Sequence, residues 1–312
     1  MGVHSTQALE TPRRSPREER HGAIALRSSD DMAAIERAGA AVAAALELAE
    51  GAVRAGATTL DVDAAVRTAL AAAGAEPAFV NYPHPTGGPA FPAAACVSVG
   101  NEVVHGVPGA RTLRAGDVVS IDVGARVGGW CADAAVTVTV PGAGDAAALA
   151  AFVADAWETL HAGIALMQPG QRWSDVADRM QRVAFGRGHG MVEGWHGHGI
   201  GRSFHEAPQA PSIVTAGLRA DRDFTLLPGM VLAVEPILVM GARGTVGPDG
   251  CATSVPAEVS GDGWTVRVAD GLVAAHVEHT VAVTRGGPRI LTRRTRAATR
   301  ETPTDGGRSL AG

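Results

Sequence analysis

Residues 118–140 read VVSIDVGARVGGWCADAAVTVTV, two β-rich runs joined by Gly128-Gly129. This pattern is typical of an antiparallel β-hairpin. In the simplest register, Asp122 and Asp133 lie opposite each other on one face, with Cβ atoms roughly 4.5–5.5 Å apart. Two carboxylates so close among apolar neighbours repel each other, and a metal ion between them would remove the repulsion. The alternatives are a bulge at the glycines or a solvent-facing strand with two unrelated acids.

Three further side chains strengthen the metal hypothesis. Glu235 and Glu278 each stand alone in an apolar, strand-like run, 228–239 and 274–284, and His198 lies in the glycine- and histidine-rich segment 196–206. Four carboxylates and one imidazole carry more charge than a single structural zinc ion requires. They suit two divalent ions about 3.5–4 Å apart, bridged by carboxylates.

The chain contains an internal repeat. Three pairs of segments match in the same order: 56–66 with 170–180, His105-Gly-Val-Pro108 with His205-Glu-Ala-Pro208, and GDVVSID (116–122) with GMVLAVE (229–235). Such repetition indicates duplicated structural units. It predicts two halves, approximately 40–145 and 146–285, related by a pseudo-twofold axis. That symmetry would bring both acids and both histidines to one central cleft.

Composition excludes several classes of protein. A hydrophobic content of 46% in 312 residues supports a full core, and a net charge of −5 gives no electrostatic reason to expect nucleic-acid binding. No apolar run reaches the ~18 residues that a membrane span needs. The three cysteines, Cys96, Cys131 and Cys251, show no framework spacing, which favours a reducing cytoplasmic location.

Periodicity predicts one domain of class α+β over residues 23–292, between disordered polar tails at 1–22 and 293–312. Apolar spacing and capping residues predict four helices. These span 29–55, 59 or 61 to 73, 146–167 and 174–187, and the glycine-rich stretch 241–263 is expected to be an extended loop.

Six motifs together resemble bacterial type I methionine aminopeptidases, in peptidase family M24, over about residues 26–292. They are the 118–140 hairpin, SVGNEVVHGVP (98–108), GHGIGRSFH (197–205), VEP (234–236), DGWTV (262–266) and VEHT (277–280). The resemblance implies the pita-bread (creatinase/aminopeptidase) fold, in which two pseudo-symmetric halves surround a curved antiparallel sheet. This agrees with the internal repeat.

The same resemblance implies roles for individual residues. The ligands of two divalent ions (Mn, Fe, Co or Zn) would be Asp122, Asp133, His198, Glu235 and Glu278. Of these, Asp133 and Glu278 would bridge the ions and Glu235 would also move a proton. His205 would stabilise the oxyanion, and His105 would contact the scissile amide nitrogen.

The implied activity is removal of an N-terminal methionine when the second residue is small. The expected partners are N-termini of nascent polypeptides, with the ribosome as a candidate place of encounter. The expected enzyme is a cytoplasmic monomer that binds neither nucleic acid specifically nor membranes.

The methionine pocket is implied at Phe91, Cys96, Phe204 and Trp264, together with His105 and His205. Several positions depart from the family pattern, among them Ala210 and Ser212, which replace larger apolar and polar residues. Gly88 stands near an expected aromatic residue, which leaves the selectivity for methionine open, and Gly100 replaces a common asparagine. Of the remaining histidines, His196 and His279 lie near ligands in sequence and could contact them, whereas His21, His84, His161 and His276 are interpreted as ordinary core or loop residues.

Other functions remain as alternatives. An Xaa-Pro aminopeptidase or prolidase would share the fold and similar ligands, but such enzymes usually carry a sizeable extra N-terminal domain. A non-catalytic pita-bread binding protein would tend to lose ligands, and all five are present here. A paralogue with narrowed specificity is compatible with the changes in the pocket. A panel of peptide substrates distinguishes these possibilities.

Overall fold

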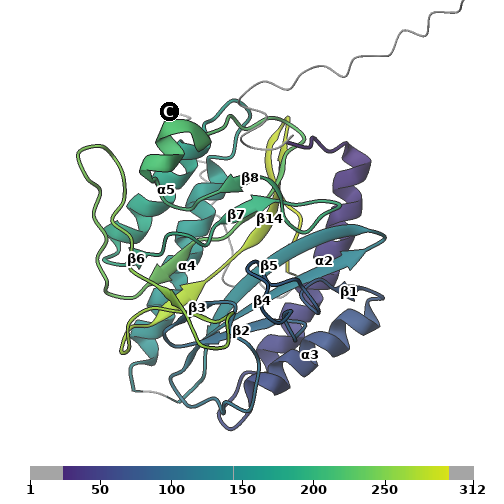
Figure 1. Ribbon diagram of the computed structural model, residues 1–312, viewed down its shortest axis with the longest axis vertical. Coiled ribbons are helices and arrows are strands. Elements are labelled where there is room, and N and C mark those ends of the chain that lie inside the picture. The colour runs from purple at the N-terminus through teal and green to yellow at the C-terminus, as the bar shows by residue number, and fades with distance from the viewer. Residues whose placement is uncertain (1–23, 143, 295–312) are drawn as a thin grey trace, which may run out of the picture.

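The computed structural model describes residues 24–142 and 144–294 (Figure 1). The predicted tail 1–22 and residues 295–312 of the predicted tail 293–312 lie outside the described residues. Arg294, at the start of the second tail, is instead part of the described fold and forms an ion pair with Glu50. All four predicted helices are confirmed, with ends that differ by a few residues. They are α2 (Ser29–Ala52), α3 (Thr59–Ala72), α4 (Ala146–Ala165) and α5 (Trp173–Gly186), and a short π-helix, η1 (Leu218–Arg222), follows in the second half.

Capping boxes fix where the first two helices begin. The Ser28 hydroxyl accepts from the backbone N–H of Asp31, whose carboxylate accepts in return from the backbone N–H of Ser28. Thr58 and Asp61 repeat the arrangement at α3. Each box satisfies two backbone donors that a helix start leaves without partners, and such a cap contributes roughly 1 kcal/mol.

Fifteen strands occur among the described residues, and every ladder between them is antiparallel. In the first half they are β1 (Glu76–Pro77), β2 (Cys96–Val99), β3 (Glu102–Val104), β4 (Val118–Val127) and β5 (Trp130–Thr139). In the second half they are β6 (Gly190–Met191), β7 (Gly197–Gly199), β8 (Glu206–Ala210), β9 (Val231–Val234), β10 (Ile237–Val239), β11 (Glu258–Val259), β12 (Val266–Arg267), β13 (Ala274–His276), β14 (His279–Thr284) and β15 (Gly287–Ile290).

The predicted hairpin is present as β4 and β5, but the predicted register is wrong. Asp122 pairs with Ala135, and Asp133 pairs with Gly124. The turn consists of Gly128 and Gly129 alone, and both have positive φ. A two-residue turn with this conformation matches the twist of the two strands that it joins. The two aspartates therefore share a face but are diagonal rather than direct neighbours, which leaves more room between them.

The two halves meet along β5. Backbone hydrogen bonds join Ala135 to Glu278 in both directions, and the Thr280 hydroxyl both accepts from Asp133 N–H and donates to its carbonyl. The sheet of the second half runs in the order β15-β14-β9-β7-β8. Helix α2 packs on β4 and β5, whereas α4 packs on β5 and β13. In Figure 1 the helix pair α2–α3 lies toward the right of the view and the pair α4–α5 toward the left.

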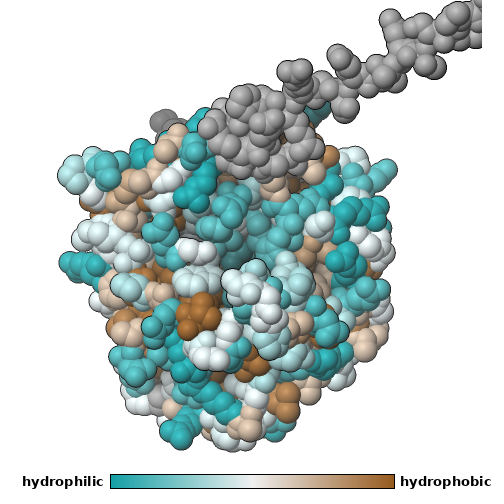
Figure 2. Space-filling model, in the orientation of Figure 1, coloured by the Kyte–Doolittle hydropathy of each residue, from teal (hydrophilic) through white to brown (hydrophobic). Residues whose placement is uncertain are grey.

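Most hydrophobic side chains join one core between helices and strands. On the face shown in Figure 2, the remaining apolar residues are scattered among polar ones. Within residues 24–142 and 144–294, no helix combines the length and hydropathy that crossing a membrane requires.

Candidate metal centre

A cavity of about 450 Å³ lies between the two halves. Every residue predicted for the site lines it. These are Phe91, Cys96, His105, Asp122, Asp133, His198, Phe204, His205, Glu235, Trp264 and Glu278. Its wall also includes Phe79, Tyr82 and His84, which sequence reasoning did not assign to the site. Segments distant in the sequence thus deliver one acidic cluster and one aromatic wall to the same space.

Asp133 and Glu278 form the centre of the acidic cluster. Both side chains are buried, and their strands are held in place by the Ala135–Glu278 and Asp133–Thr280 hydrogen bonds. With His198 they form a group whose potential ligand atoms all lie within 4.8 Å of one another. Three donors at such separations can bind a common ion, so this geometry fits a metal site.

His198 projects from the middle of β7 with its ring orientation fixed. Its Nδ1 lies 2.9 Å from the carbonyl oxygen of Gly199, to which it donates. The opposite nitrogen, Nε2, therefore carries a lone pair. It faces Asp133 Oδ2 at 3.9 Å and Glu235 Oε1 at 3.8 Å. A histidine whose outer N–H is held by a backbone carbonyl is the usual form of a metal ligand.

Glycines on both sides of His198 permit this placement. A Cβ at Gly197 would lie 2.2 Å from the Ala233 carbonyl oxygen, and one at Gly199 would lie 2.3 Å from that of Ala207. Only glycine allows β7 to approach its neighbours so closely. The Gly-His-Gly motif therefore has a packing cause as well as a chemical one.

Unpartnered oxygens in the cluster fit a bound cation. Asp122 Oδ1, Asp133 Oδ1 and Glu278 Oε1 are buried and have no hydrogen-bond partner among the described residues. Burial raises the pKa of Asp122 to about 6. Burial and mutual repulsion raise the pKa values of Asp133 and Glu278 well above their usual range. A divalent ion would both satisfy the oxygens and restore their charge, so these residues fit a metal.

Glu235, directly after β9, differs from the other three acids. Burial would raise its pKa, but the nearby His276, His198 and His205 overcome that effect and lower the pKa to about 2. Glu235 is therefore ionised even without metal. It has the charge that both a ligand and a proton acceptor require.

His105 occupies a strained position at the start of the loop after β3. Its φ is +57°, in the left-handed region that residues other than glycine rarely adopt. The next residue, Gly106, anchors the loop, because its carbonyl accepts from Val97 N–H and its N–H donates to Ser98 Oγ. Burial lowers the pKa of His105 to about 4. The ring is therefore neutral at pH 7, and such strain is typical of functional sites.

His205 is also neutral, and a neighbour selects its tautomer. Desolvation, followed by repulsion from His198, lowers its pKa to about 4. Its Nδ1 is hydrogen-bonded to the hydroxyl of Tyr82, whose pKa is raised by burial and by Asp133. A protonated phenol donates to Nδ1, which leaves the proton of His205 on Nε2. Tyr82 was not predicted, because nothing in its local sequence links it to residue 205.

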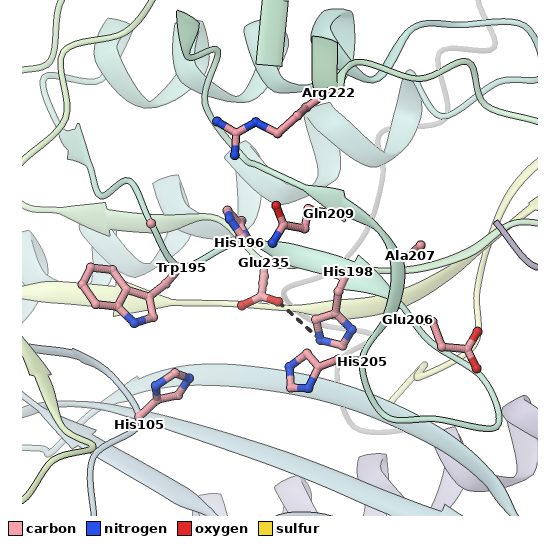
Figure 3. Close-up of a pocket in the computed structure, with 11 residues that line it drawn as sticks. His105, Trp195, His196, His198, His205, Glu206, Ala207, Gln209, Arg222 and Glu235 are labelled. Atoms are coloured by element: carbon pink, nitrogen blue, oxygen red, sulfur yellow. Dashed lines mark ion pairs between the residues drawn. The ribbon is translucent and has the colours of Figure 1, made fainter. Parts of the chain in front are cut away.

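A second cavity of about 720 Å³ adjoins the first. We call the first cavity, which contains the acidic cluster, the inner cavity, and the second one the outer cavity. Four residues line both cavities: His105, His198, His205 and Glu235. Figure 3 shows the three histidines around Glu235, with Gln209 and Arg222 along the outer wall. The cluster therefore lies at the junction between an apolar chamber and a polar opening.

The remaining histidines correct several predictions. His276, interpreted from sequence as an ordinary residue, has Nε2 3.6 Å from Glu235 Oε2. His279, expected near the ligands, instead bonds Thr292 and packs against Trp157 and His161. His196 lines the outer cavity, consistent with its predicted nearness to the ligands.

His84 also reaches the site, although it was interpreted as an ordinary residue. It lines the inner cavity, bonds the Gly263 carbonyl and packs on Trp264. Gly88 does not line that cavity, and a Cβ there would meet the His84 ring at 3.0 Å. Gly88 therefore leaves room for the His84 ring, which lines the cavity.

Known proteins resemble this chain in sequence and in fold. The family model for metallopeptidase family M24 matches residues 33–285. Methionine aminopeptidase 1 of Mycobacterium tuberculosis is 42% identical over 273 residues, covering 85% of this chain and 94% of the relative. Methionine aminopeptidase of Aquifex aeolicus is 38% identical over 272 residues, covering 86% and 99%. The crystal structure of methionine aminopeptidase from Thermotoga maritima superposes with a TM-score of 0.72 at 34% identity, covering 87% of this chain and 100% of that one.

The chain therefore belongs to metallopeptidase family M24, in the methionine aminopeptidase branch that these relatives represent. Its fold is the α+β pita-bread fold of that family, as the resemblance implied. An Xaa-Pro dipeptidase from Bacillus anthracis, 20% identical with a TM-score of 0.65, is similar in fold alone. Membership in a metallopeptidase family implies a divalent metal, for which the described residues provide a matching donor group.

Removing the metal is expected to lower the melting temperature more at pH 7.5 than at pH 5.5. Without metal, the folded-state pKa of Asp122, about 6, exceeds its usual value of 3.8. Between those values the folded state holds more protons than the unfolded state, so the stability of the metal-free protein falls as pH rises. The metal itself binds less well at pH 5.5, because it needs ionised carboxylates.

Differential scanning fluorimetry with and without EDTA at both pH values measures this difference. The lowered pKa values of His105 and His205 affect both forms and largely cancel in the comparison. An equal loss at the two pH values would show that the acidic cluster does not hold the metal.

Proposed function

We propose that the protein is a metal-dependent aminopeptidase that removes N-terminal methionine from polypeptides whose second residue is small. The observation that carries this proposal is the inner cavity, an aromatic chamber that ends at the acidic cluster. The names of the relatives support the same activity.

The apolar chamber suits a methionine side chain. Phe79, Phe91, Phe204 and Trp264 line it, and their rings meet edge to face with centroids 5.3–6.3 Å apart. A thioether packs favourably against aromatic ring edges. Trp264 is held in place because its indole N–H donates to the Pro89 carbonyl. A pocket with fixed walls favours one side chain over others of different shape.

Five residues would hold two divalent ions: Asp122, Asp133, His198, Glu235 and Glu278. The central placement of Asp133 and Glu278 supports their predicted role as bridges. Bound metal would polarise the peptide carbonyl and lower the pKa of a water to about 7. The donor set is compatible with Mn, Fe, Co or Zn.

The protein's own side chains would complete the chemistry. Glu235, ionised and at the junction of the cavities, would accept the proton of the attacking water and pass it to the leaving amine. The Nε2–H of His205 would donate to the carbonyl oxygen as negative charge develops. His105, on the other side of the junction, would contact the scissile amide nitrogen.

The junction of the cavities explains the limit on the second residue. With the methionine side chain in the inner cavity, the next residue lies between His105 and His205, and the rest of the polypeptide leaves through the outer cavity (Figure 3). A bulky second side chain would displace one of these histidines. The outer cavity is open enough for an extended chain, so the substrate class we propose is the N-termini of newly made polypeptides, encountered in the cytoplasm at or near the ribosome.

Peptides beginning Met-Ala, Met-Gly and Met-Ser are expected to be cleaved, with very weak cleavage of Met-Lys and Met-Leu. We expect this because the second side chain would lie between His105 and His205, where the two cavities meet. Release of methionine in the presence of Mn²⁺, Co²⁺ or Fe²⁺ provides the measurement, and EDTA should abolish it. Faster turnover of Xaa-Pro peptides than of every Met-initiated peptide would favour the prolidase alternative instead.

A non-catalytic binding role is the less supported alternative. All five donors and both neutral histidines line the same cavity, and peptide binding without catalysis does not require this combination of groups. We further propose that the protein acts as a monomer, because one chain contributes every residue of the site.

A further inference from the structure

His276 is a buried imidazole next to Glu235 to which no role has yet been given. It is 1% exposed, and its Nε2 has no hydrogen-bond partner among the residues that the structure describes. Glu235 Oε2 lies 3.6 Å from this nitrogen. A buried polar atom without a partner is uncommon and calls for an explanation.

Hydroxyl groups from the first half hold the His276 backbone in place. Its N–H lies within hydrogen-bond distance of Ser120 Oγ and Thr137 Oγ1, and its carbonyl accepts from Thr137. Ser120 and Thr137 also bond each other across β4 and β5. The backbone position of His276 is therefore tied to the hairpin that carries Asp122 and Asp133.

Glu235 consequently lies between two imidazoles. His198 Nε2 faces Oε1 at 3.8 Å, and His276 Nε2 faces Oε2 at 3.6 Å. The Gly199 bond gives His198 a lone pair on this side, which suits a metal ligand. The two imidazole nitrogens face different oxygens of the same carboxylate, so an N–H from His276 is the complementary partner for Oε2. The separation is slightly longer than a hydrogen bond, and a small rotation of the carboxylate closes it.

We propose that His276 is a positioning residue that donates its Nε2–H to Glu235 Oε2 and so turns Oε1 toward His198 and the metal site. This inference rests on the metal centre proposed above. The imidazole acts through Glu235 and does not touch the reacting atoms. Groups that orient a metal ligand from outside typically affect metal affinity or activity by 10–100-fold when they are removed.

Three substitutions test the proposal by the reach of their N–H donors. His276→Gln keeps a donor at similar reach, His276→Asn keeps the same amide on a shorter side chain, and His276→Leu fills the space without a donor. We expect the Asn and Leu variants to bind Mn²⁺ about 10–100-fold more weakly, and the Gln variant to stay within a few-fold of wild type. Calorimetric titration of the metal-stripped full-length protein with Mn²⁺ measures the affinities.

Kinetics on Met-Ala-Ser at saturating Mn²⁺ add a second readout. The Asn and Leu variants should lose kcat while KM stays nearly unchanged, because the methionine chamber is untouched. Wild-type Mn²⁺ affinity and kcat in the Asn variant would overturn the proposal. Equal defects in the Gln and Asn variants would also overturn it, since the imidazole itself would then be required. If His276→Leu fails to fold, the Gln and Asn pair still decides.

His279→Leu is the matched control. His279 is another buried histidine whose Nε2 has no hydrogen-bond partner within the described part of the chain, but its ring packs against Trp157 and His161. Its loss should leave Mn²⁺ affinity at the wild-type value, even if the melting temperature falls. Because calorimetry needs no substrate, it tests His276 even if the wild-type protein fails to cleave Met-Ala-Ser, which would count against the proposed function alone.

Discussion

Asp133→Asn is expected to lower kcat/KM on Met-Ala-Ser by about 10³-fold or more. Asp133 is buried at the centre of the acidic cluster, within reach of both His198 and Glu278. The amide of the variant lacks the negative charge of the carboxylate and one of its two coordinating oxygens. A metal ion supplies several kcal/mol of transition-state stabilisation, and each 1.36 kcal/mol corresponds to a factor of ten in rate. Steady-state kinetics and metal content after dialysis measure the two effects.

The same substitution should raise the melting temperature of the metal-free protein. Burial and repulsion from Asp122 raise the pKa of Asp133, so a neutral amide of the same shape removes an unfavourable charge. Asp63→Asn is the matched control, because Asp63 is buried and accepts hydrogen bonds from Ala94 and Ala95 outside the cavity. It should reduce stability and leave metal content unchanged. Near-normal activity of Asp133→Asn would refute its role in the metal centre.

His205→Ala is expected to lower kcat by about 10²–10³-fold without changing metal content. The Nε2–H that Tyr82 leaves on the neutral ring would stabilise the oxyanion, and removal of one such donor has about this effect. Metal content is unaffected in this expectation because His205 is not among the five ligands. Stopped-time assays with Met-Ala-Ser and elemental analysis provide the measurement.

Tyr82→Phe separates the contribution of the Tyr82 hydroxyl from that of the His205 ring. It keeps the aromatic wall and removes only the hydroxyl that selects the tautomer of His205. A neutral hydrogen bond contributes about 0.5–1.5 kcal/mol, so kcat should fall by roughly tenfold or less. Loss of metal from His205→Ala would mean that His205 is itself a ligand. A Tyr82→Phe defect as large as that of His205→Ala would show that the phenol has a direct role.

The separation of the acids along the chain and the periodicity around them were enough to propose the metal donors. Asp122 and Asp133 lie on either side of a Gly-Gly turn, and Glu235 and Glu278 stand alone in apolar strands. A charge in such a run must be either compensated or exposed, so the pattern predicts a compensating ion without any coordinates. The first two helices, α2 and α3, were equally predictable, because Ser28 and Thr58 cap them locally.

The hairpin register shows where this reasoning ends. A shift of two residues keeps every side chain on its face, so the alternation of Val, Ala and Asp cannot distinguish Asp122–Asp133 pairing from the observed Asp122–Ala135 pairing. The turn decides it, because Gly128 and Gly129 both adopt positive φ and thereby close a two-residue loop. The outcome changes the spacing of the acids but not their common face.

The sequence by itself was enough to recognise the family and to predict the five candidate donors and the two histidines of the repeat, since each lies in a local motif. Only the tertiary structure decided that Tyr82 reaches His205, that His276 faces Glu235, and that His279 turns away. These partners come from strands and loops far apart in the chain. Their contacts depend on how the two halves pack together, and no periodicity within a single segment encodes that packing.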